Sequence, residues 1–355
     1  MQTRISAIQA ALQRNEAIII ISDPNRLYLT GFSSSAGTLF ITKESAVFLI
    51  DFRYYEKAEK TISHCDVLLA NKLYSQLQEL IIRHGIKKVF VETSYITVDQ
   101  FKSFDSALKD CDLSAENTIN DLILKNRSMK SADEVDKIKQ AQKITDKTFQ
   151  YILNYIRPGK TEKEIMLEME FYLRKQGSEG VSFDFIVVSG KNSSLPHGVP
   201  TNKIIENGDF VTMDFGAVIE GYRSDMTRTV AVGYAGEEQR RVYHTVFEAQ
   251  HIALSCIKPG IPCVEIDSVA RSYIYKSGFE GCFGHGLGHS VGIEIHEGPS
   301  FNTIDKTILK PGMILTVEPG IYLPDRFGVR IEDMVHITED GYENLTSSSK
   351  DLLII

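Results

Sequence analysis

The residues best suited to chemistry lie in one short stretch, Cys282 to Pro299, which reads CFGHGLGHSVGIEIHEGP. It contains His285, His289 and His296, a third of the nine histidines in the chain, with glycines at positions 284, 286, 288 and 292. Glycine has no Cβ, so backbone and side chains can approach closely around a bound group. Three imidazoles among glycines, followed by the carboxylates of TVEPG and RIED, favour a metal- or ligand-binding loop over a solvated loop.

Two aspartates in apolar strand patterns are further candidates. Asp214 lies in FVTMDFG, and Asp225 follows eleven residues later in YRSDMTRTVAVG. A short turn joins the two strands, and its centre is either 219–220 or 220–221. The first register places Asp225 opposite Asp214 and the second places it opposite residue 216, so both put the carboxylates on one face of the sheet. Like charges this close require a metal ion or a shared proton. A proton-sharing dyad of the aspartic-protease kind is the alternative, but it leaves the histidines unexplained.

Two glutamates complete the acidic set. Glu318 ends the apolar pattern ILTVEPG, and Glu332 follows fourteen residues later in FGVRIEDMVHI. A charged side chain in such a pattern is costly unless it is paired or binds a cation. Four carboxylates and one imidazole are a hard, oxygen-rich set that suits manganese, cobalt, iron or zinc in a two-metal site better than a thiolate zinc site. Two such ions lie about 3.5–4 Å apart and acidify a shared water.

The composition indicates an ordinary globular protein that is long enough for two domains. Of its 355 residues, 43% are hydrophobic and 24% are charged. The net charge of −8 argues against a nucleic-acid partner, which would favour a basic protein. Five scattered cysteines without a CxxC pair indicate free thiols in a reducing compartment, and the apolar run 17–21 is far too short to span a membrane. We therefore expect a cytoplasmic protein without a membrane partner.

The first 126 residues alternate helical and strand patterns and predict an α/β accessory domain. Helical spacing of apolar residues is found over 2–13, 75–84 and 97–108. Strand patterns are found over 17–21, 38–42, 46–50, 67–70 and 88–91, the second and third of them forming a hairpin, and residues 22–25 are expected to form a turn. No GxGxxG motif follows these strands, so a dinucleotide fold is not supported.

Residues 127–355 begin with a capping box, Ser131 and Glu134, which predicts a long helix that ends before Pro158. An internal duplication follows. Eight identities recur 101 residues apart, at 156, 158, 159, 164, 165, 177, 179 and 180 in the first copy. Further on, NGDFVTMDFG resembles PGMILTVEPG at a spacing of 104, which aligns Asp214 with Glu318 (318 − 214 = 104). Two equivalent carboxylates predict a pseudo-symmetric domain with a site between its halves.

Taken together, these motifs resemble those of the pita-bread metallopeptidases, which include methionine aminopeptidase, aminopeptidase P and prolidase. The family's ligand order of Asp, Asp, His, Glu and Glu matches Asp214, Asp225, His289, Glu318 and Glu332. The N-terminal part resembles the accessory domain of the proline-specific branch. The resemblance implies an α/β N-terminal domain (1–126) followed by an α+β pita-bread domain (127–355). In the second domain, duplicated helix-helix-strand halves would surround a curved antiparallel sheet.

The resemblance also implies how two divalent ions would be held. Asp214 would chelate one ion, Asp225 and Glu332 would bridge both, and His289 and Glu318 would hold the other. Glu318 would also be catalytic, as the general base or proton shuttle for the water between the ions. Manganese is the expected metal, with cobalt or zinc as alternatives.

Five residues are implied on the substrate side. His197, in NSSLPHGVP, would be a catalytic residue near the leaving proline, and His296 would be a second one that donates to the oxyanion. His285, which matches the first histidine of an HGxxH pattern, would bind substrate. Arg330 and Tyr322 would bind substrate as well, and Arg330 could instead support the carboxylates.

The implied activity is hydrolysis of Xaa-Pro bonds in small peptides by a homodimer. We expect the dipeptidase (prolidase), because the chain is short and its N-terminal domain is small. The alternative is aminopeptidase P, which removes the residue before proline from longer peptides. A metal-free creatinase-like hydrolase and a non-catalytic binding homologue are remoter alternatives, since all five ligand positions are intact.

Overall fold

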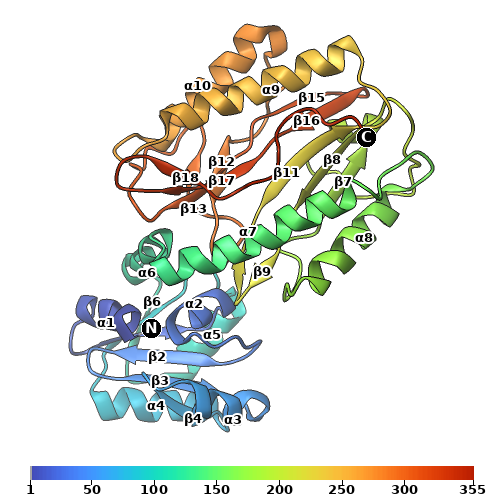
Figure 1. Ribbon diagram of the computed structural model, residues 1–355. Coiled ribbons are helices and arrows are strands. Elements are labelled where there is room, and N and C mark those ends of the chain that lie inside the picture. The colour runs from blue at the N-terminus through green and yellow to red at the C-terminus, as the bar shows by residue number, and fades with distance from the viewer. Residues whose placement is uncertain (1) are drawn as a thin grey trace. The chain divides into compact units, whose positions relative to one another are not determined.

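The computed structural model describes the backbone of residues 2–355 and the side chains from residue 4 onward (Figure 1). The chain divides into two compact units, the first ending at Arg127 and the second beginning at Ser128. The boundary expected from the sequence followed residue 126. No helix within residues 2–355 combines the length and the apolar character needed to cross a bilayer.

The first unit is built on a mixed six-stranded sheet with the order β4-β3-β2-β1-β5-β6. β1 and β2 pair antiparallel, as do β2 and β3, whereas β3 pairs parallel with β4 and β5 pairs parallel with both β1 and β6. Its strands are β1 (Glu16–Ile20), β2 (Thr38–Thr42), β3 (Ala46–Ile50), β4 (Asp66–Leu69), β5 (Lys88–Val91) and β6 (Asp112–Ser114). Its helices are α1 (Gln2–Ala11), α2 (Asp23–Thr30), α3 (Phe52–Thr61), α4 (Leu73–His84), α5 (Val98–Ala107) and α6 (Thr118–Ser128).

The expected alternation of helices and strands is confirmed, and the β2–β3 hairpin has the predicted bounds. The prediction of a turn at residues 22–25 is wrong, because these residues begin helix α2. The side chain of Ser22 accepts a hydrogen bond from the backbone N–H of Asn25, and Pro24 occupies the first turn. Proline is tolerated there since the first N–H groups of a helix have no intrahelical partner. A proline that resembled a turn signal was therefore a helix-start signal.

The second unit consists of two helix pairs and antiparallel strand ladders. Its helices are α7 (Ala132–Ile152), α8 (Glu162–Lys175), the 3-10 helix η1 (Gly190–Ser194), α9 (Glu237–Cys256), α10 (Cys263–Ile274) and the π-helical turn η2 (Tyr275–Phe279). Its strands are β7 (Ile186–Ser189), β8 (Phe210–Phe215), β9 (Val218–Ile219), β10 (Tyr222–Arg223), β11 (Met226–Ala231), β12 (Gly288–Ser290), β13 (Glu297–Phe301), β14 (Ile314–Val317), β15 (Gly320–Leu323), β16 (Phe327–Arg330), β17 (Asp333–Ile337) and β18 (Tyr342–Asn344). The predicted capping box of Ser131 and Glu134 is present at the start of α7.

The duplication seen in the sequence is a duplication of structure. In the first half β8 lies between β7 and β11, and in the second half β14 lies between β12 and β17. The backbone repeats as well. Gly159 and Gly260 have φ of 93° and 91°, and Gly208 and Gly312 both have φ of 92°. Such angles favour glycine, because a Cβ is strained in this region. The repeated Pro-Gly and Asn-Gly signals therefore mark the same turns in both halves.

Each half has its own apolar core, and one pair of helices covers each core (Figure 1). Ile144 of α7 and Ile165 of α8 belong to a cluster that includes Met213 of β8. Val246 of α9 and Ile266 of α10 belong to a larger cluster with β14, β15 and β17. The opposite faces of the central strands are thereby free to carry the polar residues of the site.

The hairpin between the two aspartates settles the register that the sequence left open. Tyr222 pairs with Ile219, so the turn is centred on Glu220 and Gly221, whose φ values are 47° and 78°. Two positive φ angles are typical of a type I′ turn. The adjoining ladder pairs Phe215 with Met226, which continues to residue 216 opposite Asp225. The second of the two predicted registers is the one observed.

Candidate metal centre and substrate cavity

The second unit contains a cavity of about 880 Å³ into which the predicted metal ligands converge. Such a volume is within the usual range for a small-molecule site. The predicted residues that line it are Asp214, Asp225, His289, Glu318, Glu332, His197, His285, His296 and Arg330. Tyr322 is not part of this lining, although it contacts two residues that are.

The four carboxylates occupy equivalent places in the two halves. Asp214 is in β8 and Glu318 directly follows β14, the central strands of their ladders. Asp225 directly precedes β11, and Glu332 directly precedes β17. The duplication therefore delivers two carboxylates from each half to one place. His289 comes from β12 and has no counterpart among these four.

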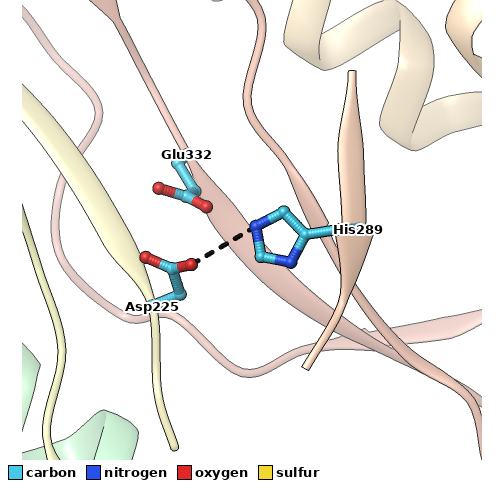
Figure 2. A group of neighbouring side chains, drawn as sticks. All are labelled: Asp225, His289 and Glu332. Atoms are coloured by element: carbon cyan, nitrogen blue, oxygen red, sulfur yellow. Dashed lines mark ion pairs between the residues drawn. The ribbon is translucent and has the colours of Figure 1, made fainter. Parts of the chain in front are cut away.

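Figure 2 shows Asp225, His289 and Glu332 with their side chains directed toward one another. One potential ligand atom of each lies within 4.8 Å of the others. His289 Nε2 is 3.6 Å from Asp225 Oδ2 and 3.4 Å from Glu318 Oε1. His289 Nδ1 faces the carbonyl of Ser290 at 3.2 Å, and only a protonated Nδ1 can donate to it. In this neutral tautomer the lone pair of Nε2 faces two carboxylate oxygens. All three atoms are hydrogen-bond acceptors, and none of them supplies a proton to the others.

Three buried oxygens at the centre, Asp214 Oδ1, Asp225 Oδ1 and Glu332 Oε1, have no hydrogen-bond partner among the residues that the structure describes. Burial, together with the nearby carboxylates, raises the pKa of Asp225 and of Glu332 well above the usual values. Burial also lowers the pKa of His289 to about 4, which keeps its imidazole neutral. A divalent cation would bind the unpaired oxygens, offset the repulsion between the carboxylates and accept the lone pair of the neutral imidazole. These residues therefore fit a metal centre.

In the metal-free protein we expect the thermal stability to fall as the pH rises through neutrality. Burial raises the pKa of Glu318 from 4.5 to about 8, with a further contribution from Asp214. A carboxyl group whose pKa is raised by folding stabilises the protein fully below its unfolded pKa, and this stabilisation is lost as the pH approaches the folded value. In EDTA, the melting temperature of the wild type should therefore decrease more steeply between pH 4.5 and 8 than that of Glu318→Gln. Parallel curves for the two proteins would contradict this assignment.

Arg330 links the carboxylates to a network of hydrogen bonds. Its Nη2 donates to Asp214 Oδ2 at 2.6 Å, and its Nε donates to Thr227 Oγ1 at 2.9 Å. Thr227 Oγ1 in turn donates to Glu332 Oε2 at 2.8 Å. The Arg330 side chain is only 4% exposed. It therefore orients two of the proposed ligands, one directly and one through a threonine.

The other end of this network fixes His285. Arg330 Nη1 donates to the Tyr322 hydroxyl at 2.8 Å, and that hydroxyl lies 2.9 Å from His285 Nε2. His285 Nδ1 is 2.8 Å from the carbonyl of Gly286, to which it must donate. Burial lowers the pKa of His285 to about 4, so the neutral ring accepts from Tyr322. Both ring nitrogens are thus engaged within the protein. Direct substrate binding by His285 and Tyr322 stays a prediction, and the geometry favours a supporting role for both.

His197 and His296 are the imidazoles most open to the cavity. Both are exposed, and His197 lies in the loop after η1. The rings of His296 and His289 are 4.4 Å apart and nearly perpendicular. Burial, followed by the charge of His197, lowers the pKa of His296. Each ring carries an N–H that it can present to a substrate oxygen.

Two threonines with a role at this site were not found by sequence reasoning. Thr316 accepts from the backbone N–H of His289 and donates to Glu318 Oε1, both at 3.1 Å. Thr227 joins Glu332 to Arg330 as described above. Each lies two residues from a proposed ligand along a strand, Thr316 before Glu318 and Thr227 after Asp225. Residues two apart share a face, and that spacing was the signal available.

The structure also separates Asp333 from its neighbour Glu332. Asp333 is fully buried and accepts from Arg228, Asn344 and Lys350 on the other side of β17. Arg228 and Lys350 hold the pKa of Asp333 below its usual value despite its burial. Because neighbouring residues in a strand face opposite ways, Asp333 lies outside the cavity that Glu332 lines.

Comparison with known proteins identifies the family to which this chain belongs. Residues 136–339 match metallopeptidase family M24, and residues 4–122 match the Creatinase/Prolidase N-terminal domain. The first match covers more than half of the chain, and the chain belongs to metallopeptidase family M24, a family that depends on metal ions. The expected fold class, an α/β creatinase-type domain followed by a pita-bread catalytic domain, is confirmed.

Several relatives are similar to this chain over nearly their whole length. An Xaa-Pro dipeptidase of Pyrococcus horikoshii is 37% identical over 360 residues, covering 99% of each chain. The solved structure of an Xaa-Pro dipeptidase from Bacillus anthracis has a TM-score of 0.94 at 39% identity, covering 99% of each chain. The structure of an X-Pro aminopeptidase from Thermotoga maritima MSB8 has a TM-score of 0.91 at 34% identity, covering 98% of this chain and 99% of that one. The fold is therefore common to proteins of both names.

Proposed function

We propose that this metallopeptidase hydrolyses the peptide bond between an N-terminal residue and proline, with Xaa-Pro dipeptides as its preferred substrates. The observation that carries the proposal is the convergence of four carboxylates, four histidines and Arg330 in one cavity. The similarity to Xaa-Pro dipeptidases over 99% of the chain supports the dipeptide preference. The similarity to an X-Pro aminopeptidase keeps cleavage of longer peptides as the second candidate.

Asp214, Asp225, His289, Glu318 and Glu332 are the proposed ligands of two divalent ions, for which manganese is the first candidate. Four carboxylates and a neutral imidazole favour such a hard ion over metals that prefer thiolates. When bound, the ions would polarise the scissile carbonyl and lower the pKa of the attacking water. Metal analysis of the purified protein, followed by reloading with manganese, cobalt or zinc, tests the identity of the ion.

Glu318 is the proposed general base. Its side chain is 16% exposed, compared with 5% for Asp225, so it is the more accessible of the two from the cavity. It would accept a proton from the attacking water and deliver it to the prolyl nitrogen as the bond breaks. Thr316 orients the carboxylate through its hydrogen bond to Oε1. Proline leaves as a secondary amine, so this proton transfer completes the reaction.

His296 and His197 are the proposed substrate-side groups. Both reach the cavity and are exposed. An N–H of His296 would stabilise negative charge on the carbonyl oxygen in the transition state, and His197 would contact the prolyl residue. Arg330 has its three nitrogens committed to Asp214, Tyr322, Thr227 and the carbonyl of Pro196. We therefore propose that it positions Asp214 and does not grip the substrate.

A matched set of peptides tests the substrate. Apolar side chains of Met166, Phe183 and Ile186 line the cavity, so leucine is a suitable first residue. We compare Leu-Pro, Leu-Pro amide and Leu-Pro-Gly, and we expect kcat/KM for Leu-Pro to be at least about tenfold higher than for either of the other two. A site that binds the free carboxylate of the dipeptide has polar groups that stay unpaired when the amide is bound in its place. Leu-Ala serves as the control for proline selectivity. Faster cleavage of Leu-Pro-Gly would establish the aminopeptidase instead.

A further inference from the structure

A buried ion pair outside the set of proposed ligands lies beneath the loop that carries His296. Lys130 stands just before the capping residue of α7, and its side chain is 1% exposed. Its Nζ is 3.1 Å from Glu297 Oε2 and donates to Ser290 Oγ, also at 3.1 Å. Ser290 adjoins His289, and Glu297 adjoins His296. One ammonium group therefore contacts the immediate neighbours of both histidines.

The carboxylate of Glu297 organises the loop between the two histidines. Its Oε1 accepts from the backbone N–H of Ile293 at 3.0 Å and from that of Glu294 at 3.2 Å. A Cβ on Gly292 would lie 2.5 Å from Glu297 Oε2, so a larger residue there would displace the carboxylate from its present place. The loop thus folds around a buried negative charge, which requires a buried positive partner.

The position of Lys130 is itself fixed by the duplicated architecture. Its backbone N–H donates to the carbonyl of Gly312 at 2.8 Å, at the turn that leads into β14. Ser290 Oγ donates to the carbonyl of Ile314 in that same strand at 2.8 Å. The ammonium group is therefore held against β14, the strand that precedes Glu318. The strands β12 and β13 shift register between His289 and Ser290, where backbone pairing alone defines the loop less well.

We propose that Lys130, acting through Glu297 and Ser290, is a positioning residue that sets the place of His296 over His289. It does not touch the substrate. Its charge holds the Glu297 carboxylate, the carboxylate holds residues 293 and 294, and this fixes the direction in which His296 leaves the loop. The inference rests on the proposed function insofar as His296 acts on the substrate in the transition state.

The test compares Lys130→Met, Glu297→Gln and the double variant with the wild type, all as full-length metal-loaded protein. Lys139→Met is the matched control, because Lys139 lies in α7 and pairs with Glu343 at the surface. We expect kcat to fall by about 10–100-fold in each single variant with KM within about threefold, since small misplacements of a catalytic group cost up to about 10²-fold. The double variant should lose no more than the worse single one, because the two residues act as a unit. Lys139→Met should keep its kcat within twofold.

Amide hydrogen exchange provides a readout that needs no substrate. In Lys130→Met and Glu297→Gln, the amides of Ile293 and Glu294 should exchange at least tenfold faster, while those of β8 stay protected. Unchanged exchange at 293 and 294, or an equal rise throughout β8, would overturn the proposal. The proposal would also be overturned if the fold-loss of kcat in the double variant equalled the product of the two single-variant losses. Should Lys130→Met not fold, Glu297→Gln decides by the same two measurements. If the wild type cleaves no Xaa-Pro peptide, the proposed function fails while the exchange data still decide the positioning role.

Discussion

Replacing Glu332 by glutamine is expected to abolish peptidase activity while the fold is kept. Glu332 is 1% exposed, and its Oε2 accepts from Thr227, a hydrogen bond that the glutamine oxygen can still accept. The substitution removes one negative charge from the proposed metal centre and nothing from the apolar core. We expect kcat/KM to fall by about 10²–10³-fold, the loss found when one electrostatic group of an active site is removed. Steady-state kinetics with added manganese measure this.

The same variant should be more stable than the wild type when both are free of metal. Burial and the charges of Glu318 and Asp214 raise the pKa of Glu332, so its ionised form destabilises the metal-free fold at neutral pH. In EDTA at pH 7 the melting temperature of Glu332→Gln should exceed that of the wild type, and added manganese should raise it less. Glu343→Gln, at an exposed ion pair, is the control and should change neither quantity. An active Glu332→Gln variant would remove this residue from the site.

Replacing Arg228 by methionine is expected to lower the free energy of unfolding more than any other substitution considered for this protein. Arg228 is 1% exposed and donates to Asp333, to the backbone carbonyls of Ser348 and Ser349, and to that of Glu332. Without Arg228, the fully buried carboxylate of Asp333 keeps only its side-chain contacts with Lys350 and Asn344 among those described above. Breaking a buried pair in this way costs about 3–5 kcal/mol. Urea unfolding of the two proteins measures the difference in the free energy of unfolding.

A second arginine provides the control for that experiment. Arg326 pairs with Glu238 at the surface, where both side chains are about half exposed. Arg326→Met should cost less than about 1 kcal/mol, because solvent screens an exposed pair. Adding Asp333→Asn to Arg228→Met should recover part of the lost stability, since it removes the charge that has lost its main partner. Equal costs for the two arginines would show that burial of the Arg228 pair is energetically unimportant.

The N-terminal unit shows how far local signals reach. Apolar strand patterns predicted β2, β3 and β5 with the observed bounds. The same reasoning placed a turn at residues 22–25, where the chain starts α2. Proline after a polar residue is compatible with both a turn and a helix start, and the choice depends on whether the next residues can be buried. Asn25 and Arg26 are buried within α2, and that burial is a tertiary property.

The sequence alone determined which residue types the site contains and that two halves supply them. The spacing of 104 residues aligns Asp214 with Glu318 in the sequence itself, because a duplication preserves turn glycines and strand positions together. Strand alternation also places Asp333 on the face opposite Glu332, since neighbouring residues in a strand face opposite ways.

Only the tertiary structure decided what each polar group binds. Whether Tyr322 faces the cavity or Arg330, and whether His285 has a free nitrogen, depends on distances between residues far apart in the chain. Lys130 is separated from Glu297 by 167 residues, and no periodicity connects them. Local patterns report which face of an element is apolar. Hydrogen bonds and buried charges are pairwise, so their partners are fixed only when the two halves pack.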